Sequence, residues 1–195
     1  MFQVRIHGRG GQGVVTAAEL LSVAAFSEGQ YAQVLPGLGL DRVGAPMVSF
    51  CRMADEPIRT HEPVTGPDAL IIQDPSLLAH PSLLTGLGAG GYLLVNSMRG
   101  LAELGIAAHA ARMDTGRLLV LPATQLALDH LGRPLPGAAL LGGFAALTGQ
   151  VRLDSVEAAI RERFTGPAAD GNVAAAQAAY QLAAETRVAG ERIGA

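Results

Sequence analysis

Gly8-Arg9-Gly10-Gly11-Gln12-Gly13 is a glycine loop that stands between two segments of different periodicity. Before it, residues 2–7 alternate apolar and polar side chains, which predicts a β-strand. After it, apolar residues recur at helical spacing from Val14 to about Phe26, which predicts an α-helix. A Gly-x-Gly-x-x-Gly sequence between a strand and a helix is typical of an α/β fold that binds phosphate groups at the loop.

The residue types of the glycine loop suit an anionic ligand. Glycine lets the backbone approach a phosphate group because no Cβ intervenes. The N–H groups at the start of the next helix point at the anion, and the helix dipole favours its charge. Arg9 adds a planar cation that matches phosphate geometry. We therefore expect a phosphate-containing ligand at this loop, and a tight turn without a ligand is the alternative.

Two common nucleotide sites fit the sequence poorly. An NAD site requires Asp or Glu about 20 residues after the loop, where it binds the ribose hydroxyls. The corresponding segment, residues 30–35, contains no acid. A Walker loop ends in Gly-Lys followed by Ser or Thr, and this loop does not. The sequence thus favours phosphate binding over an independent NAD-dependent enzyme.

The rest of the chain predicts an α/β architecture. Strands are expected at 31–35, 47–53, 68–74, 92–95 and 117–121, and helices at about 81–87 and 101–111. Every segment after residue 123 has helical patterning, with helices expected around 126–131, at 138–148, from 154 to about 164 and from 172 to about 188. Alternating strands and helices favour a mostly parallel sheet covered on both faces. We expect one domain over residues 1–195, with a Rossmann-like sheet and a helical C-terminal part.

Composition favours a folded chain that other chains partly cover. Hydrophobic residues make up 49% of the 195 residues and charged residues 16%, which is too apolar for a disordered protein. The low charge predicts that part of the surface is buried against partners. A net charge of -3, scattered basic residues and the absence of Trp argue against nucleic-acid binding.

Other features of the sequence bear on location and on metal binding. No stretch approaches the roughly 20 uninterrupted apolar residues of a membrane span, and residues 2–7 show no signal peptide, so we expect a cytoplasmic protein without membrane contact. Cys51 is the only cysteine, which excludes a cysteine-ligated cluster within the chain. Its apolar neighbours favour a buried core residue over a reactive thiol. The histidines lack metal-ligand spacing.

Polar residues end two of the later strands. Asp74 closes the strand at 68–74, and Asn96 and Ser97 follow the strand at 92–95. Ligands of open α/β sheets bind outside the carboxyl ends of the strands, so these residues could border the glycine loop. Caps or turns are the alternative for all three. Arg42, within a loop at 37–46, is either an exposed cation or a contact to a ligand or a subunit.

Several segments together resemble the gamma subunit of pyruvate and related 2-oxoacid:ferredoxin oxidoreductases, in the same order along nearly the whole chain. They are Ile6-His7-Gly8-Arg9-Gly10-Gly11-Gln12-Gly13-Val14-Val15-Thr16, Arg42-Val43-Gly44-Ala45-Pro46, residues 68–74, Leu94-Val95-Asn96-Ser97, Leu131-Gly132-Arg133-Pro134 and Leu140-Leu141-Gly142-Gly143-Phe144. The chain departs from the family at residues 40–43, which are usually more charged, and at Gly137, where Asn is frequent.

The resemblance implies a subunit of an enzyme that oxidatively decarboxylates a 2-oxoacid to an acyl-CoA. The family uses thiamine diphosphate with Mg and [4Fe–4S] clusters, and it passes electrons to ferredoxin or another acceptor. This chain lacks a Gly-Asp-Gly thiamine motif, so these cofactors are expected on thiamine-binding alpha and beta chains and a ferredoxin-like delta chain.

By the same resemblance, the gamma subunit contributes to coenzyme A binding and has no catalytic residue of its own. The expected contacts to coenzyme A are Gly8, Arg9, Gly10, Gly11, Gln12, Gly13, Arg42, Asn96 and Ser97. A free-standing phosphate- or nucleotide-binding module is the alternative function, and it predicts a stable monomer.

Overall fold

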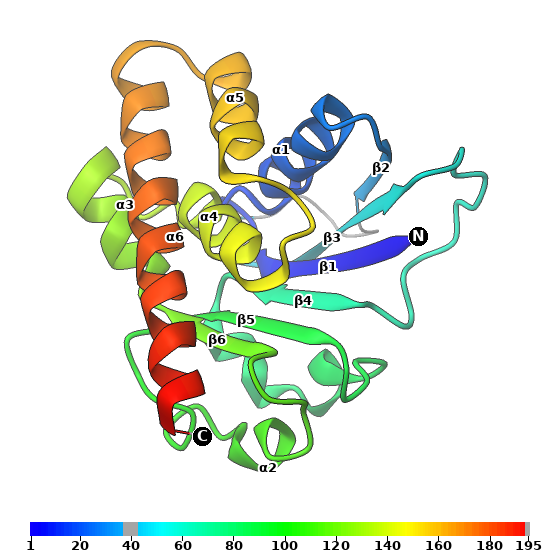
Figure 1. Ribbon diagram of the computed structural model, residues 1–195, viewed down its shortest axis with the longest axis vertical. Helices are drawn as coiled ribbons and strands as arrows, with labels where there is room; N and C mark the ends of the chain where they lie inside the picture. Colours follow the sequence, from blue (N-terminus) through cyan, green and yellow to red (C-terminus); the bar gives the residue numbers. More distant parts are fainter. Residues whose placement is uncertain (37–42, 194–195) are drawn as a thin grey trace.

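The computed structural model describes residues 1–36 and 43–193, and within them a six-stranded sheet forms the centre of the molecule (Figure 1). The strands lie in the order β2-β3-β1-β4-β5-β6. Their bounds are β1 (Phe2–Arg9), β2 (Tyr31–Pro36), β3 (Pro46–Ala54), β4 (Ala69–Ile72), β5 (Tyr92–Asn96) and β6 (Leu118–Leu121). The predicted α/β class with a single sheet is confirmed.

Most of the sheet is parallel, as predicted. β1, β4, β5 and β6 pair in parallel, whereas β3 pairs antiparallel with both β1 and β2. A parallel crossover needs a dozen or more residues, and the connection from β2 to β3 is shorter than that. The antiparallel direction of β3 places its first residue, Pro46, opposite Arg9 at the end of β1. This pairing extends β1 two residues beyond its predicted end and into the glycine loop.

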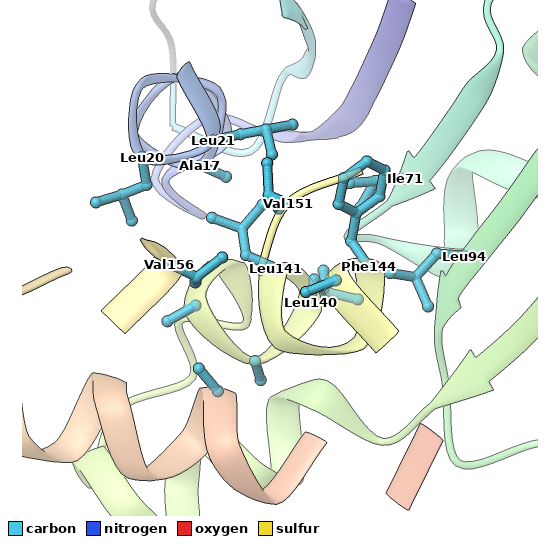
Figure 2. Packing of buried hydrophobic residues seen from close by; sticks show 14 of the residues in the cluster. Ala17, Leu20, Leu21, Ile71, Leu94, Leu140, Leu141, Phe144, Val151 and Val156 are labelled. Carbon is cyan, nitrogen blue, oxygen red and sulfur yellow. The ribbon is translucent and has the colours of Figure 1, made fainter. Parts of the chain in front are cut away.

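Long helices cover one face of the sheet (Figure 1). The sheet is contacted by α1 (Val14–Ser27), α4 (Gly137–Thr148) and α6 (Gly166–Ile193), while α3 (Ala123–Leu131) and α5 (Leu153–Arg163) pack mainly on these helices. The central helix, α4, is apolar along its whole length, and it buries Leu140, Leu141 and Phe144 almost completely. Figure 2 shows these side chains between α1 and the sheet residues Ile71 and Leu94. None of the helices in the described residues is long and apolar enough to cross a membrane.

The opposite face of the sheet has a thinner cover than predicted. Leu70, Ile72, Leu93 and Val95 point to this face and form a second apolar cluster with Leu77, Leu83, Leu104 and Ile106. The cover consists of two 3-10 helices, η1 (Pro75–Ala79) and η2 (Pro81–Leu84), and the one-turn helix α2 (Ala107–Ala110).

The expected helices at 81–87 and 101–111 are therefore wrong in type or extent. Glycines interrupt both segments. Gly86 and Gly105 have φ angles of 88° and 71°, a backbone conformation that ends a right-handed helix and that other residues rarely adopt.

Candidate functional site

The glycine loop lies at the carboxyl end of β1, between the sheet and α1. Gly8 is still part of β1, and a Cβ built on it would lie 2.6 Å from Val14 Cγ2 of α1. A larger residue would therefore push the helix away from the sheet. Gly11 and Gly13 have φ angles of 91° and 74°, which suit glycine because its missing Cβ allows the left-handed region. The glycines thus let the loop turn sharply and keep α1 against β1.

Gly10 is tied to the segment that precedes β3. Its N–H donates to the carbonyl oxygen of Ala45 at 2.9 Å, and its own carbonyl accepts from the N–H of Gly44 at 2.9 Å. Gly10 also forms an isolated parallel bridge with Val43. Since both backbone groups are used, Gly10 supports the loop and has no free donor for a ligand.

The N-terminus of α1 is the open donor group of the loop. Gly13 is the N-cap residue, no side chain caps the helix, and no acid stands in the first turn. The first helical hydrogen bond runs from the N–H of Ala17 to the carbonyl of Gly13 at 2.9 Å. The N–H groups of residues 13–16 have no acceptor among the described residues. Such a helix end attracts an anion through its free N–H groups and its dipole.

Arg9, Gln12, Asp74 and Ser76 form a polar network beside the loop, here called the Arg9 cluster. Arg9 Nε lies 3.2 Å from Asp74 Oδ2, and Arg9 Nη2 donates to Ser76 Oγ at 2.8 Å. Gln12 Nε2 donates to Asp74 Oδ2 at 3.0 Å, while Gln12 Oε1 accepts from the N–H of Arg9 at 2.8 Å. The side chains of Arg9 and Gln12 are therefore held in place before any ligand binds.

The Arg9 cluster keeps Asp74 ionised. Partial burial of Asp74 opposes its charge, but hydrogen bonds from Ser76 and Gln12 and the charge of Arg9 outweigh burial. The pKa of the Asp74 carboxyl is consequently below its ordinary value. Asp74 also accepts from the N–H of Ser76 at 2.9 Å and caps η1. Asp74 therefore has the capping role that the sequence analysis gave as its alternative. It also lies beside the glycine loop.

Asn96 points into the protein. Only 6% of the residue is exposed, and its Nδ2 donates to the carbonyl of Gln73 and to Thr124 Oγ1, both at 2.7 Å. Its Oδ1 accepts from the N–H of Thr124 in the first turn of α3 at 3.0 Å. The side chain joins the ends of β4 and β5 to the start of α3. This geometry matches the capping alternative for Asn96, which also borders a hollow at the ends of β5 and β6.

Ser97 lies outside the Arg9 cluster and makes a local contact. Ser97 Oγ accepts from the N–H of Arg99 at 2.8 Å, as in a turn. Ser97 and Arg99 border a hollow of about 270 Å³ at the ends of β5 and β6, together with Pro75. Arg42 lies outside the described residues. Its neighbour Val43 is 92% exposed beside the loop.

Two residues near the loop were not predicted from the sequence. Ser76 completes the Arg9 cluster, and its signal is the Asp-Pro-Ser sequence after β4, which is typical of a capped turn. Gln73 is 1% exposed, and neither its Nε2 nor its Oε1 has a hydrogen-bond partner among the described residues. A polar residue at the end of a wholly apolar strand was the available signal for Gln73.

His7 and Cys51 lie in the central strands, and burial shifts the pKa of each. Burial, aided by the charge of Arg5, lowers the pKa of His7 to about 4. Burial raises the pKa of Cys51 to about 12, and Cys51 is 0% exposed, which confirms the expected core residue. No group of three or more His, Cys, Asp or Glu residues in the described parts could hold a metal ion.

Comparisons with known proteins identify the family of the chain. Residues 3–182 match the family described as pyruvate ferredoxin/flavodoxin oxidoreductase. The common gamma subunit of the pyruvate/ketoisovalerate oxidoreductases of Thermococcus kodakarensis is 42% identical, over 92% of this chain and 96% of the relative.

Two solved structures share the fold. Pyruvate oxidoreductase subunit PORC of Thermotoga maritima superposes with a TM-score of 0.78 and 33% identity, over 92% of this chain and 95% of that one. A 2-oxoglutarate:ferredoxin oxidoreductase of Magnetococcus marinus has a TM-score of 0.71 at 13% identity, over 93% of this chain and 31% of that one. The second likeness shows the fold alone. With the family match and the gamma-subunit relatives, the chain belongs to the pyruvate ferredoxin/flavodoxin oxidoreductase family, as a gamma-type subunit of a 2-oxoacid oxidoreductase.

Proposed function

We propose that this gamma-type domain, residues 1–195, helps to bind coenzyme A and to assemble a cytoplasmic complex that oxidises a 2-oxoacid to an acyl-CoA. Thiamine diphosphate with Mg and the [4Fe–4S] clusters are then held by thiamine-binding alpha and beta chains and a ferredoxin-like delta chain. Ferredoxin or another acceptor takes the electrons from the complex. Within this proposal, the present chain binds and positions a substrate and performs no chemical step.

The open N-terminus of α1 beside Arg9 is the observation that best supports the proposal. The free N–H groups of residues 13–16 can donate to phosphate oxygens. Arg9 adds a guanidinium whose side chain is 32% exposed. Coenzyme A contains a diphosphate and a further phosphate, and these groups suit a glycine loop, a helix N-terminus and an arginine.

The guanidinium of Arg9 must exchange its present hydrogen-bond acceptors before all of its N–H groups can donate to a phosphate. Its Nη1 donates to the carbonyl of Gly44 at 3.0 Å, and its Nε and Nη2 face Asp74 and Ser76. A phosphate oxygen can replace the carboxylate of Asp74 as the acceptor, since both are anionic oxygens. Asp74 would keep its hydrogen bonds from Gln12 and Ser76 during this exchange.

A solved neighbour lends independent support. The structure of the Magnetococcus marinus enzyme contains 2-oxoglutarate, coenzyme A and succinyl-CoA. This chain matches 31% of that polypeptide in fold, so the gamma-type fold occurs in an enzyme that binds coenzyme A.

The proposal is tested with the intact complex, purified through a tag on this chain without oxygen. We expect thiamine diphosphate, iron and CoA-dependent oxidation of a 2-oxoacid to co-purify. Arg9→Gln should raise the KM for coenzyme A about tenfold and leave kcat nearly unchanged, because it removes one charged phosphate contact. A panel of 2-oxoacids in the same assay identifies the substrate.

Arg161→Gln is the matched control. Arg161 is also a surface arginine with a carboxylate partner, Asp170 at 2.8 Å, but it lies on α5. The control should leave the KM for coenzyme A unchanged. A lone, colourless protein without partners would instead favour a free-standing phosphate-binding module. An intact, active complex in which both variants behave like the native chain would place coenzyme A elsewhere.

A further inference from the structure

Arg9 pairs with one carboxylate among the described residues, that of Asp74. Asp74 Oδ2 lies 3.2 Å from Arg9 Nε, and the side chains of Arg9 and Asp74 are 32% and 17% exposed. Residues 8–13 and the first turn of α1 contain no acid. A carboxylate and a phosphate are both anionic oxygen acceptors. The guanidinium that we propose for a ligand phosphate therefore already has an anion of the chain beside it.

The capping role of Asp74 does not require Arg9. Asp74 Oδ1 accepts from the N–H of Ser76 at 2.9 Å and from Ser76 Oγ at 2.6 Å. Asp74 Oδ2 accepts from Gln12 Nε2 at 3.0 Å. Each carboxylate oxygen thus has a donor other than the arginine. The contact with Arg9 is an additional interaction between charges, and water screens partly exposed ion pairs of this kind, so a multiply charged ligand can replace it.

The same hydrogen bonds keep Asp74 in place when a phosphate arrives. Ser76 holds the carboxylate at the start of η1, and Gln12 holds it against the glycine loop. Burial opposes the charge of Asp74, but the hydrogen bonds from Ser76 and Gln12 and the charge of Arg9 hold its pKa below the ordinary value. Asp74 is therefore ionised at neutral pH, and it repels a phosphate bound nearby.

Arg9 can bind a phosphate in two ways, and Asp74 weakens both. A guanidinium has five N–H groups. Arg9 Nη1 donates to the carbonyl of Gly44 at 3.0 Å, and Arg9 Nη2 donates to Ser76 Oγ at 2.8 Å. A phosphate on the remaining N–H groups shares the cation with Asp74, whereas a phosphate that replaces Asp74 leaves the carboxylate without its cation. In both cases the affinity is lower than Arg9 and the open end of α1 would give alone.

The chemistry of coenzyme A gives a reason for moderate affinity at this site. The acyl group is joined to the thiol, so coenzyme A and the acyl-CoA product carry the same phosphates. Tighter binding of the phosphates would hold substrate and product alike. Binding energy that does not change during the reaction does not raise kcat, and product release limits kcat in many enzymes.

We propose that Asp74 determines the affinity of this site, because its carboxylate competes with the phosphate groups of coenzyme A for Arg9 and so speeds the release of acyl-CoA. The inference rests on the proposed function, since it requires a phosphate to bind at Arg9. It gives Asp74 the opposite role to that of a supporting residue, whose removal would weaken binding.

Asp74→Asn in the intact complex tests the proposal. Asparagine is also a favourable N-cap residue, so the variant keeps an acceptor for the N–H of Ser76 and removes the charge. The KM for coenzyme A should fall about threefold, and acyl-CoA should dissociate about threefold more slowly. Inorganic pyrophosphate, which presents the anion alone, should inhibit the variant more strongly by a similar factor. Asp74→Ser, which also retains a capping side chain, should act in the same direction.

Asp170→Asn is the matched control, because Asp170 pairs with a surface arginine, Arg161, at 2.8 Å. It should change neither the KM for coenzyme A nor the inhibition by pyrophosphate. In the Arg9→Gln background, Asp74→Asn should lower the KM by a smaller factor, since no guanidinium remains for the carboxylate to occupy. An equal factor in both backgrounds would show that Asp74 does not compete for Arg9.

The variants also separate this inference from the proposed function. A raised or unchanged KM for coenzyme A in Asp74→Asn, while Arg9→Gln still raises the KM, would overturn the inference and leave the proposed function standing. If Arg9→Gln leaves the KM unchanged, coenzyme A does not use Arg9, and both the proposed site and the role of Asp74 are overturned.

Discussion

At the scale of single residues, the glycine loop was largely predictable and its polar neighbours were not. The sequence Gly8 to Gly13 predicts a turn, a close approach to α1 and an open helix end, and the structure has all three. The direction of a polar side chain at a strand end depends on tertiary neighbours. Asn96 turns inward because Thr124 and the carbonyl of Gln73 lie within its reach, and residues this distant in sequence give no local signal.

His7 allows a pH prediction at this scale. Its pKa is about 4 in the folded chain and near 6.5 when unfolded, because burial, aided by Arg5, disfavours its charged form. The unfolded chain therefore binds the proton first, and stability falls as the pH drops from about 6.5 to about 4. Between about pH 7 and pH 4.5, the free energy of unfolding of the native chain should fall by about 2 kcal/mol more than that of the His7→Gln variant.

Urea unfolding at several pH values measures this difference. The control is His130→Gln, which changes an exposed histidine on α3. It should follow the pH dependence of the native chain. Parallel stability curves for the native chain and His7→Gln would show that His7 does not titrate differently on folding.

At the scale of elements, the sequence predicts helices well where the hydrophobic periodicity is strong. It predicts them poorly where glycines interrupt the segment. The expected helices after Gly13 and at 138–148 match α1 and α4 within a residue or two. The expected helix at 101–111 reduces to the single turn α2, because Gly105 breaks it and few apolar residues hold it. The final helix begins at Gly166, six residues before its predicted start, because packing against α3 and α4 sustains a weak local preference.

The crossing of α4 and α6 gives a prediction for elements. A Cβ on Gly142 would overlap the backbone carbonyl of Ala176 in α6, so only glycine permits this close approach. Gly142→Ala should lower the free energy of unfolding by about 2–3 kcal/mol, since the helices must separate. Chemical denaturation measures the loss.

Gly137→Ala is the control for Gly142→Ala because it adds the same methyl group to the same helix. The nearest atom to its new Cβ is 3.5 Å away. Its stability should stay within about 0.5 kcal/mol of the native value or rise slightly. Equal losses in the two variants would mean that helix crossing does not limit residue size at Gly142.

At the scale of the whole molecule, the two faces of the sheet differ in how they are protected. Long helices cover one face, whereas η1, η2 and α2 cover the other with short segments and connecting loops (Figure 1). The sequence predicted the parallel core and both covers. It did not predict the unequal thickness, because the apolar residues of the thin face are spaced like those of helices.

This asymmetry predicts unequal local stability. Segments with few buried contacts open before the core does. In hydrogen exchange measured by mass spectrometry, amides of residues 75–84 and 107–110 should exchange at least tenfold faster than those of α4 and β4. Similar protection in both sets would indicate that the thin cover unfolds only together with the whole chain.

The bonds between Gly10 and the segment before β3 affect how the loop forms during folding. In the same region, Arg9 Nη1 donates to the carbonyl of Gly44, and these two residues are 35 positions apart in sequence. Such a pairing requires a large loop of chain to close first, and closure of this kind slows folding. The loop between β1 and α1 therefore gains its hydrogen bonds to residues 44 and 45 only when the segment before β3 has docked. A motif that looks local in the sequence is therefore completed late, by a strand that runs in the opposite direction.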